Sequence, residues 1–544
     1  MFRGKLCTKE LLPFPKGTRT LNKFILLIIV LSSERVEFIS QMIDPVEKFL
    51  ATENDPYKND ETEKFDPKTV EGLKELGAFG LQVPEEYDGV GLCNTEYARV
   101  VSIVGLTDLA LGIFLGSHQS IGYKGILLYG TEEQKKKYLP DLASGRKLAA
   151  YCLTEPMHGS DASSIKTKAV LSPDGKHYIM NGSKVWISNG GWADVFTVFA
   201  KVPVTDKDGQ TKDKMTGFIV ERGFGGLKHS EPEKKMGIKA SNTVSLYFED
   251  CKIPVENVLG EVGQGFKVAV NILNQGRFGM ASALSGTMRT AIGKAADFAS
   301  QRHQFDRHIK DFESVREKIA MMCMRQYATE SMAFMVSGIM DLGAKDFQVE
   351  AAISKIYSSE AAWFCVDEAI QIHGGMGFMR ETQLERVLRD LRVFRIFEGA
   401  NDVLRLFVTL TAMNNAGKHL AASAKSPGGL LSLFSSSMKT KLGLSPSASE
   451  FAGKISPTLA DASKLIGENV DKIAWTVFNL LRVHKKAIIE EQYKLTRLAD
   501  AGHAVTKRSL EDIDGSEQTR DLVRSVSKEV FDHLGMVPKS PIGV

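Results

Sequence analysis

The sequence has few cysteines and lacks the common short motifs for metals and nucleotides. Its six cysteines lie far apart, and no C-x-x-C pair occurs, which argues against a structural zinc site and a redox dithiol. There is no H-E-x-x-H, no G-x-S-x-G and no G-x-x-x-x-G-K-[ST], so zincins, α/β-hydrolases and P-loop proteins lose their main support. We therefore expect no metal site, and a reducing compartment fits best.

Excess charge and long apolar runs are also absent. Lysine and arginine number 69 against 66 acidic residues, a net charge of +3, so the chain has no electrostatic footprint for nucleic acid. The apolar run Phe24–Leu31 has eight residues, whereas a membrane-spanning helix needs about 20. We interpret this run as a buried helix, with a signal-type segment as the alternative. Residues 1–23 carry six basic residues and one acidic residue, which is compatible with a transit peptide.

The 544 residues, 43% of them hydrophobic, predict several structural units with ample material for a core. Changes in composition and in the spacing of apolar residues divide the chain into six parts. They are an atypical segment 1–35, a helical domain 36–150, a β domain 151–260, a helix bundle 261–412, a linker or membrane-contact segment 413–456, and a helical domain 457–544.

Within the β domain, the pattern predicts a hairpin over residues 177–187. Asn181-Gly182 separates two short apolar runs and supplies the positive φ values of a type I′ turn. Further strands are expected at 195–201, 216–221 and 243–248, which together predict an antiparallel unit. Four amphipathic stretches then predict the helices of the bundle, at 266–303, 312–342, 346–372 and 381–396.

Four motifs at the junctions of these units are more specific than the pattern of elements. In chain order they are Tyr151–Asp161 (YCLTEPMHGSD), Trp186–Ser188 (WIS), Gln371–Gly377 (QIHGGMG) and Arg395–Asp402 (RIFEGAND). Together they resemble the acyl-CoA dehydrogenase family over nearly the whole chain. Within it, the chain is most similar to the mitochondrial very-long-chain branch. The resemblance implies an α+β, mostly α fold: an N-terminal helical domain, a central antiparallel β domain, a four-helix bundle and an extra helical C-terminal domain.

The family removes two hydrogens from an acyl thioester and uses FAD. A proton α to a thioester is a poor acid, so its removal needs a base in a dry site, where burial raises the pKa of a carboxyl. Glu398 matches the family's catalytic base, and its apolar neighbours Ile396 and Phe397 argue against a solvent-exposed glutamate. A dinucleotide-binding fingerprint is absent. Gly159 permits close approach of the backbone, and Thr154 and Ser160 offer hydroxyls and backbone donors to a flavin.

The resemblance assigns further residues to the cofactor and the substrate. FAD contacts are expected from Tyr151, Cys152, Leu153, Thr154, Gly159, Ser160, Trp186, Ile187, Ser188, Arg302, His303, Gln304, Gln371, Ile372, His373, Gly374, Gly375, Ala400, Asn401 and Asp402. Substrate contacts are expected from Ser160, Asn274, Gln275, Gly276, Arg277 and Gly399. In the family, the groups around Arg302 and Gln371 serve the FAD of a neighbouring subunit, which implies a homodimer.

Two positions depart from the family pattern. Ala400 stands where threonine is usual, so one hydroxyl near the flavin is lost, and Asp306 stands where glycine is usual. A single neutral hydrogen bond contributes about 0.5–1.5 kcal/mol, so activity should survive the first change, whereas a carboxylate near a pyrophosphate weakens FAD binding. We interpret Arg386, Arg389, Arg392 and Arg395 as a solvated helix face paired with Glu385 and Asp390.

The implied activity is dehydrogenation of long and very long acyl-CoAs to trans-2-enoyl-CoAs in mitochondrial β-oxidation, with electrons passed to electron transfer flavoprotein. The implied location is the matrix side of the inner membrane, where the apolar and basic segment 428–444 is the candidate for peripheral contact. A disordered linker is the alternative for that segment. The alternative function is a non-enzymatic assembly scaffold for respiratory complex I, as in a sister branch of the family.

Gly112 and Gly116 lie four residues apart in an otherwise apolar segment. On one face of a helix they remove side-chain volume where a slot for an acyl chain can run. Ordinary close packing of helices explains the same spacing equally well.

Overall fold

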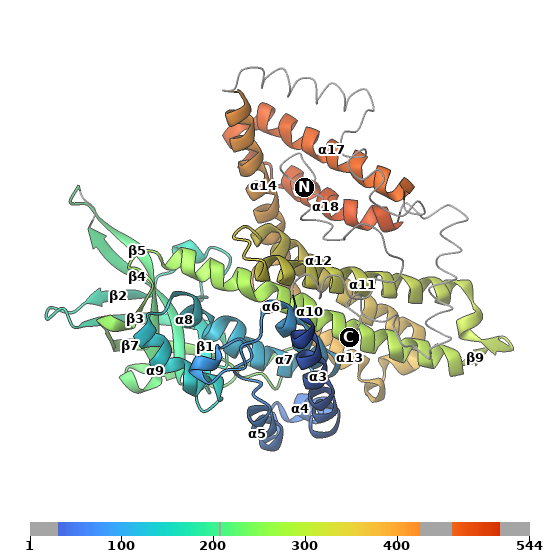
Figure 1. Cartoon of the computed structure of the whole chain (residues 1–544), viewed down its shortest axis with the longest axis horizontal. Coiled ribbons are helices and arrows are strands. Elements are labelled where there is room, and N and C mark those ends of the chain that lie inside the picture. The colour runs from blue at the N-terminus through green and yellow to red at the C-terminus, as the bar shows by residue number, and fades with distance from the viewer. Residues whose placement is uncertain (1–30, 206–207, 425–459, 512–544) are drawn as a thin grey trace.

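The computed structural model describes residues 31–205, 208–424 and 460–511. Figure 1 shows a sheet at one end, long helices across the centre and two further helices, α17 and α18, beside the end of α14. The apolar run from Phe24 to Val30 and the candidate membrane segment 428–444 lie outside the described residues. No helix of the described part is long and apolar enough to cross a bilayer. Its histidine, cysteine and acidic side chains form no group placed to hold a metal ion.

The N-terminal part is helical. Its elements are α3 (Ser33–Glu53), α4 (Pro56–Thr62), α5 (Pro67–Glu75), α6 (Asn94–Thr107), α7 (Leu109–Gly116), a π-helical turn η2 (Ser117–Gly122), α8 (Lys124–Tyr129) and α9 (Glu132–Ala143). Local sequence sets several helix starts. Asp55 and Asp66 cap helices whose first residue is proline, and Thr131 with Gln134 forms the capping box that begins α9.

Eight described strands form one sheet. They are β1 (Ala149–Cys152), β2 (Lys168–Leu171), β3 (His177–Ser188), β4 (Val195–Thr205), β5 (Thr211–Glu221), β6 (Leu227–His229), β7 (Thr243–Pro254) and β8 (Val258–Leu259). The order is β6-β7-β3-β2-β4-β5-β8, and β1 pairs with β4. The sheet is mixed rather than wholly antiparallel, because β1 and β2 both run parallel to β4. Parallel pairs need long connections, and residues 153–194, which include β2 and β3, provide the connection between β1 and β4.

The predicted hairpin at 177–187 is wrong. These residues form the single strand β3, and Asn181-Gly182 marks a shift of register against β7. Gly182 has φ +148°, and a Cβ there would lie 2.6 Å from the Thr167 hydroxyl oxygen. The glycine therefore serves the close approach of a neighbouring segment rather than a turn.

The bundle contains α10 (Gly265–Gln301), α11 (Glu313–Asp341), α12 (Gln348–His373) and α14 (Asn401–Ala424). The predicted fourth helix at 381–396 is wrong. That stretch holds only α13 (Leu384–Leu391), with 3-10 turns on both sides. The chain takes left-handed φ values at Gln383 (+59°) and Glu398 (+51°), which end regular helix at both limits of the segment.

The C-terminal helices pack on the end of α14. This helix runs past the predicted boundary at residue 413. α17 (Ala460–His484) and α18 (Gln492–Glu511) share a small core with it, formed by Met413, Val470, Val477, Leu495 and Leu498 among others. Arg405 of α14 pairs with Glu360 of α12 at 2.9 Å and with Asp500 of α18 at 2.7 Å, which ties these helices to the bundle.

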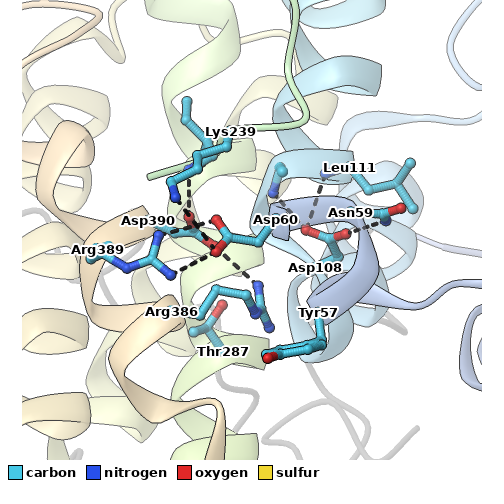
Figure 2. A network of polar contacts seen from close by, with 12 residues as sticks. Tyr57, Asn59, Asp60, Asp108, Leu111, Lys239, Thr287, Arg386, Arg389 and Asp390 are labelled. Atoms are coloured by element: carbon cyan, nitrogen blue, oxygen red, sulfur yellow. Dashed lines mark hydrogen bonds and ion pairs between the residues drawn. The ribbon is translucent and has the colours of Figure 1, made fainter. Parts of the chain in front are cut away.

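The arginines of α13 pair as predicted with Glu385 and Asp390, but their face is not solvated. Arg386 and Asp390 form a buried pair at 3.1 Å, and Arg389 reaches Asp60 of α4 at 2.7 Å (Figure 2). Burial raises the pKa of Asp390 to about 7. The same helix face meets the β domain, because the backbone N–H of Ile238 donates to Asp390. Periodicity alone does not reveal which face of a charged helix is covered.

A second group of hydrogen bonds, centred on Asp108, holds the start of α7. The Asp108 carboxylate accepts the backbone N–H of Ala110 at 2.9 Å. It also accepts the Asn59 amide at 3.1 Å (Figure 2). α7 is thereby anchored to α4, and the following turns of α7 form part of the wall of the large cavity described next.

Candidate active site

The N-terminal helices, the β domain and the bundle enclose a cavity of about 460 Å³. Its walls are mostly apolar, with side chains such as Met42, Val46, Leu73, Val104 and Leu115 from α3, α5, α6 and α7. Polar groups enter from the 151–160 turn, the end of β3, Arg277 of α10 and Glu398. This combination suits a ligand with a long apolar part and a small polar reacting group.

Glu398 is the ionisable group best placed for chemistry here. Its Oε2 atom is inaccessible to bulk water and has no hydrogen-bond partner. Burial raises the pKa of Glu398 to about 7, although the positive charges of Arg277 and Lys355 oppose the rise. The residue also has a left-handed φ of +51°, which costs free energy for a non-glycine residue and is typical of functional positions. As a whole the residue is half-buried, and it lines the cavity.

Two cations hold the backbone around Glu398. Arg277 donates from Nε and Nη2 to the carbonyl oxygen of Glu398, at 3.3 and 3.2 Å, and from Nη1 to Asn274 at 2.5 Å. Lys355 of α12 donates from Nζ to the carbonyl oxygen of Gly399 at 2.8 Å and to Oδ1 of Asn401 at 2.9 Å. The guanidinium of Arg277, predicted to contact the substrate, thus binds the loop that carries Glu398.

Sequence reasoning missed Lys355, Tyr97 and Ser120. Lys355 is buried and is the one lysine of α12, and this is the only signal in the sequence that pointed to it. The hydroxyls of Tyr97 and Ser120 lie 2.6 Å apart, and both residues line the cavity. Burial raises the pKa of Tyr97 to about 12, so this hydroxyl stays protonated.

A buried ion pair shapes the 151–160 turn. The Glu155 carboxylate accepts from Nζ of Lys184 at 2.8 Å and from the backbone N–H groups of Lys166 and Thr167 at 2.6 and 2.9 Å. Lys184 also donates to the carbonyl oxygen of Leu153 at 3.1 Å. These bonds fix the turn against β3, two residues before Trp186.

The structure brings most of the predicted flavin residues of the β domain to the cavity. Its lining includes Tyr151, Leu153, Thr154, Gly159, Ser160, Trp186, Ile187 and Ser188, together with Gly276, Arg277, Glu398 and Gly399. The Cys152 side chain instead packs in the sheet core, where burial raises the pKa of its thiol. Asn274, Gln275, Ala400, Asn401 and Asp402 are not among the lining residues. Asn401 lies behind the loop, where its amide donates to Ser359 and Glu360 of α12.

The surfaces at this end of the cavity fit a flat aromatic group. Trp186 is 65% exposed and has a left-handed φ of +57°, and no atom lies within 4 Å of the place where a Cβ on Gly159 would stand. The exposure of Trp186 and the open space beside Gly159 therefore leave room for a ring system at this end of the cavity.

The second group of predicted cofactor residues lies elsewhere. Arg302, His303 and Gln304 follow the end of α10, about 39 Å along that helix from Gly276 at 1.5 Å per residue. The group Gln371, Ile372, His373, Gly374 and Gly375 ends α12, where the His373 ring stacks on Phe298 at 4.4 Å and space is open around both glycines. One chain thus carries two separate halves of the predicted cofactor site.

Comparison with known proteins agrees with this division of the chain. Three acyl-CoA dehydrogenase family models match in order: the N-terminal domain at residues 38–146, the middle domain at 150–251 and the C-terminal domain at 263–412. The chain belongs to the acyl-CoA dehydrogenase family. A fourth model, described as the ACAD9/ACADV C-terminal domain, matches residues 457–533.

The relatives include the very-long-chain specific, mitochondrial acyl-CoA dehydrogenases of Macaca fascicularis and Homo sapiens. Each is 56% identical over 508 residues, which cover 92% of this chain and 75% of the relative. A solved acyl-CoA dehydrogenase from Bacillus anthracis in complex with FAD is 34% identical. It covers 94% of this chain and 88% of its own, with a TM-score of 0.77. The family and the fold predicted from the four motifs are confirmed.

Proposed function

We propose that this acyl-CoA dehydrogenase uses FAD to oxidise long and very long acyl-CoAs to trans-2-enoyl-CoAs, with Glu398 as the base. One observation carries the proposal: the buried Oε2 atom of Glu398 has no hydrogen-bond partner, and Glu398 lines a cavity whose other walls are largely apolar. A scaffold without catalysis has no need of such a carboxyl. The similarity to very-long-chain dehydrogenases likewise disfavours the assembly-scaffold alternative.

The chain's own residues account for the proton-transfer step. The largely apolar cavity limits contact of the Glu398 carboxyl with water. Its pKa of about 7 makes it a stronger base than an exposed carboxylate and leaves about half of it ionised at neutral pH. Arg277 and Lys355 keep the loop of Glu398 in place. FAD, when bound against Trp186 and the 151–160 turn, supplies the acceptor for the hydride from the β carbon.

The direct test is the colour and the half-reaction of the purified protein. We expect a yellow protein whose flavin absorbance is bleached by palmitoyl-CoA without oxygen. At subsaturating substrate, the bleaching rate should rise as the pH increases through about 7, since only the ionised form of Glu398 accepts a proton. A flavin-free chain, or a flavin that palmitoyl-CoA leaves oxidised, would contradict the proposal.

Gly112 and Gly116 support a long acyl slot. Both line the cavity. A Cβ on Gly112 would meet only the Val104 side chain, at 3.7 Å, and a Cβ on Gly116 would meet nothing within 4 Å. Close helix packing therefore does not explain the two glycines, and we infer that they keep the slot open.

Substitution of Gly112 should shorten the preferred substrate. We expect Gly112→Gln to lower activity on C16 acyl-CoA much more than on C8 acyl-CoA, because the added side chain enters the cavity. The measurement is the ratio of kcat/KM for the two substrates, with Gly223→Gln, at an exposed position of the β domain with open space around it, as a control for folding and handling. An unchanged ratio in folded Gly112→Gln would exclude the slot from this position.

The remaining assignments follow from family membership. We propose a homodimer in which Arg302–Gln304 and Gln371–Gly375 of one copy complete the FAD site of the other, which agrees with their distance from the cavity along α10. We further propose mitochondrial location, electron transfer flavoprotein as the acceptor, and peripheral membrane contact through segment 428–444.

At the tip of the hairpin formed by β9 (His303–Gln304) and β10 (Arg307–His308), Asp306 has φ +60°, a conformation that glycine adopts more easily.

A further inference from the structure

The loop that carries Glu398 has an unfavourable backbone conformation. Glu398 has φ +51°, and Gly399 follows with φ +94°. A non-glycine residue in the left-handed region persists only when its surroundings hold it there. The contacts of this loop therefore decide whether the carboxyl points into the cavity.

Lys355 supplies one of these contacts from α12. Its Nζ donates to the carbonyl oxygen of Gly399 at 2.8 Å and to Oδ1 of Asn401 at 2.9 Å, and the whole side chain is buried. Both acceptors are neutral groups of the loop or of the first turn of α14. Burying an ammonium group against neutral oxygens costs desolvation free energy. An uncharged donor would make two structural hydrogen bonds at a lower cost in free energy.

Asn401 extends this attachment. While its Oδ1 accepts from Lys355, its Nδ2 donates to Ser359 Oγ at 3.0 Å and to Glu360 Oε1 at 3.1 Å. One short stretch of α12 therefore binds Gly399 and Asn401, which follow Glu398, through Lys355, Ser359 and Glu360. Arg277 of α10 grips the carbonyl oxygen of Glu398 itself.

We propose that Lys355 is a positioning residue for Glu398: it holds the 398–401 loop so that the carboxyl faces the cavity, and its charge favours the ionised form of that carboxyl. This inference rests on the proposed role of Glu398 as the base. The ionisable groups that face Glu398 are Arg277 of α10, Lys355 of α12, Tyr97 of α6 and Tyr151 of β1. The two tyrosines stay neutral because burial raises the pKa of each, so the positive charge comes from Arg277 and Lys355. Burial lowers the pKa of Lys355 to about 7, so its ammonium charge is present on the acid side of that pH, where the acid limb of the profile lies.

The test is Lys355→Met in the full-length holoenzyme, which removes the charge and the donors but keeps the length of the side chain. We expect kcat with palmitoyl-CoA to fall about 10²-fold, the scale of a displaced catalytic group, while KM changes by less than about threefold. The acid limb of the pH profile should move to higher pH, because a lost positive charge raises the pKa of Glu398. A crystal structure should show Glu398 leaving the left-handed region.

Lys235→Met is the matched control. Lys235 lies in a loop of the β domain and also donates to a backbone carbonyl oxygen, that of Ser241 at 2.6 Å. It should leave kcat and the pH profile unchanged. If Lys355→Met behaves like this control, the positioning role is overturned. A merely structural role for Lys355 predicts lower stability with an unmoved acid limb, which would also overturn it.

A second variant covers the case in which Lys355→Met does not fold. Lys355→Gln removes the charge but keeps an uncharged hydrogen-bond donor for the loop. We expect the same upward shift of the acid limb, and an unchanged profile would contradict the proposal. Glu398→Gln separates the two hypotheses: if it retains turnover, the base assignment itself fails, whereas an inactive Glu398→Gln beside a normal Lys355→Met refutes only the role of Lys355.

Discussion

Replacing Glu398 by glutamine is expected to lower turnover of palmitoyl-CoA by about 10²–10⁴-fold or more, the usual loss when a general base is removed. Glutamine has the size of glutamate, so the cavity and the grip of Arg277 and Lys355 on the loop should persist. The variant should therefore remain yellow and should still bind acyl-CoA. The measurement is the anaerobic rate of flavin bleaching in a stopped-flow instrument.

The control for this substitution is Glu381→Gln. Glu381 is exposed in a short turn before α13 and does not line the cavity. Its bleaching rate should match that of the unaltered protein. Binding of acyl-CoA to Glu398→Gln is followed by the change in flavin absorbance on titration, which separates loss of chemistry from loss of binding. Bleaching of Glu398→Gln at the unaltered rate would place the base elsewhere.

Breaking the buried pair of Glu155 and Lys184 should have the largest effect on stability. Lys184→Met leaves a buried carboxylate without its cation, a change that typically costs about 3–5 kcal/mol. Because Glu155 also organises the 151–160 turn through the backbone of Lys166 and Thr167, the loss should reach the flavin as well. We expect a clear fall in melting temperature and faster release of FAD.

Two further variants test this explanation. Lys228→Met breaks the exposed pair of Lys228 and Glu249 on the same sheet, where such pairs contribute about 0–1 kcal/mol, so it should melt close to the unaltered protein. The double variant Lys184→Met with Glu155→Gln removes the uncompensated charge and should recover part of the lost stability. A single variant Lys184→Met as stable as Lys228→Met would show that the ion pair does not hold the turn.

Several features were readable because the residues involved are neighbours in sequence. Residues at both ends of the turn from Tyr151 to Ser160 reach the cavity, and the capping box of Thr131 and Gln134 begins α9. Helix caps and contiguous motifs depend on groups only a few residues away in the chain. Their physical cause can therefore be recognised in the sequence itself. The family followed from such contiguous motifs.

The tertiary structure decided the features that depend on contacts between distant segments. Asn181-Gly182 has the local preference of a turn, but pairing with β7 and the close approach of Thr167 keep it inside a strand. The arginines of α13 have the pattern of a solvated face, yet packing buries Arg386 against Asp390. Local propensity is worth a few tenths to about one kcal/mol per residue, which a single well-packed tertiary contact exceeds.

The same distinction applies at the candidate active site. The sequence by itself determined the family, the identity of the proposed base and the turn proposed to hold the flavin, since each resides in a short contiguous motif. Only the folded chain placed Lys355 on the carbonyl oxygen of Gly399, Arg277 on that of Glu398, and the apolar walls of α3 and α5 around the cavity. Burial and electric fields are properties of the whole neighbourhood, so the pKa of Glu398 near 7 arises only when helices distant in sequence exclude water from its carboxyl.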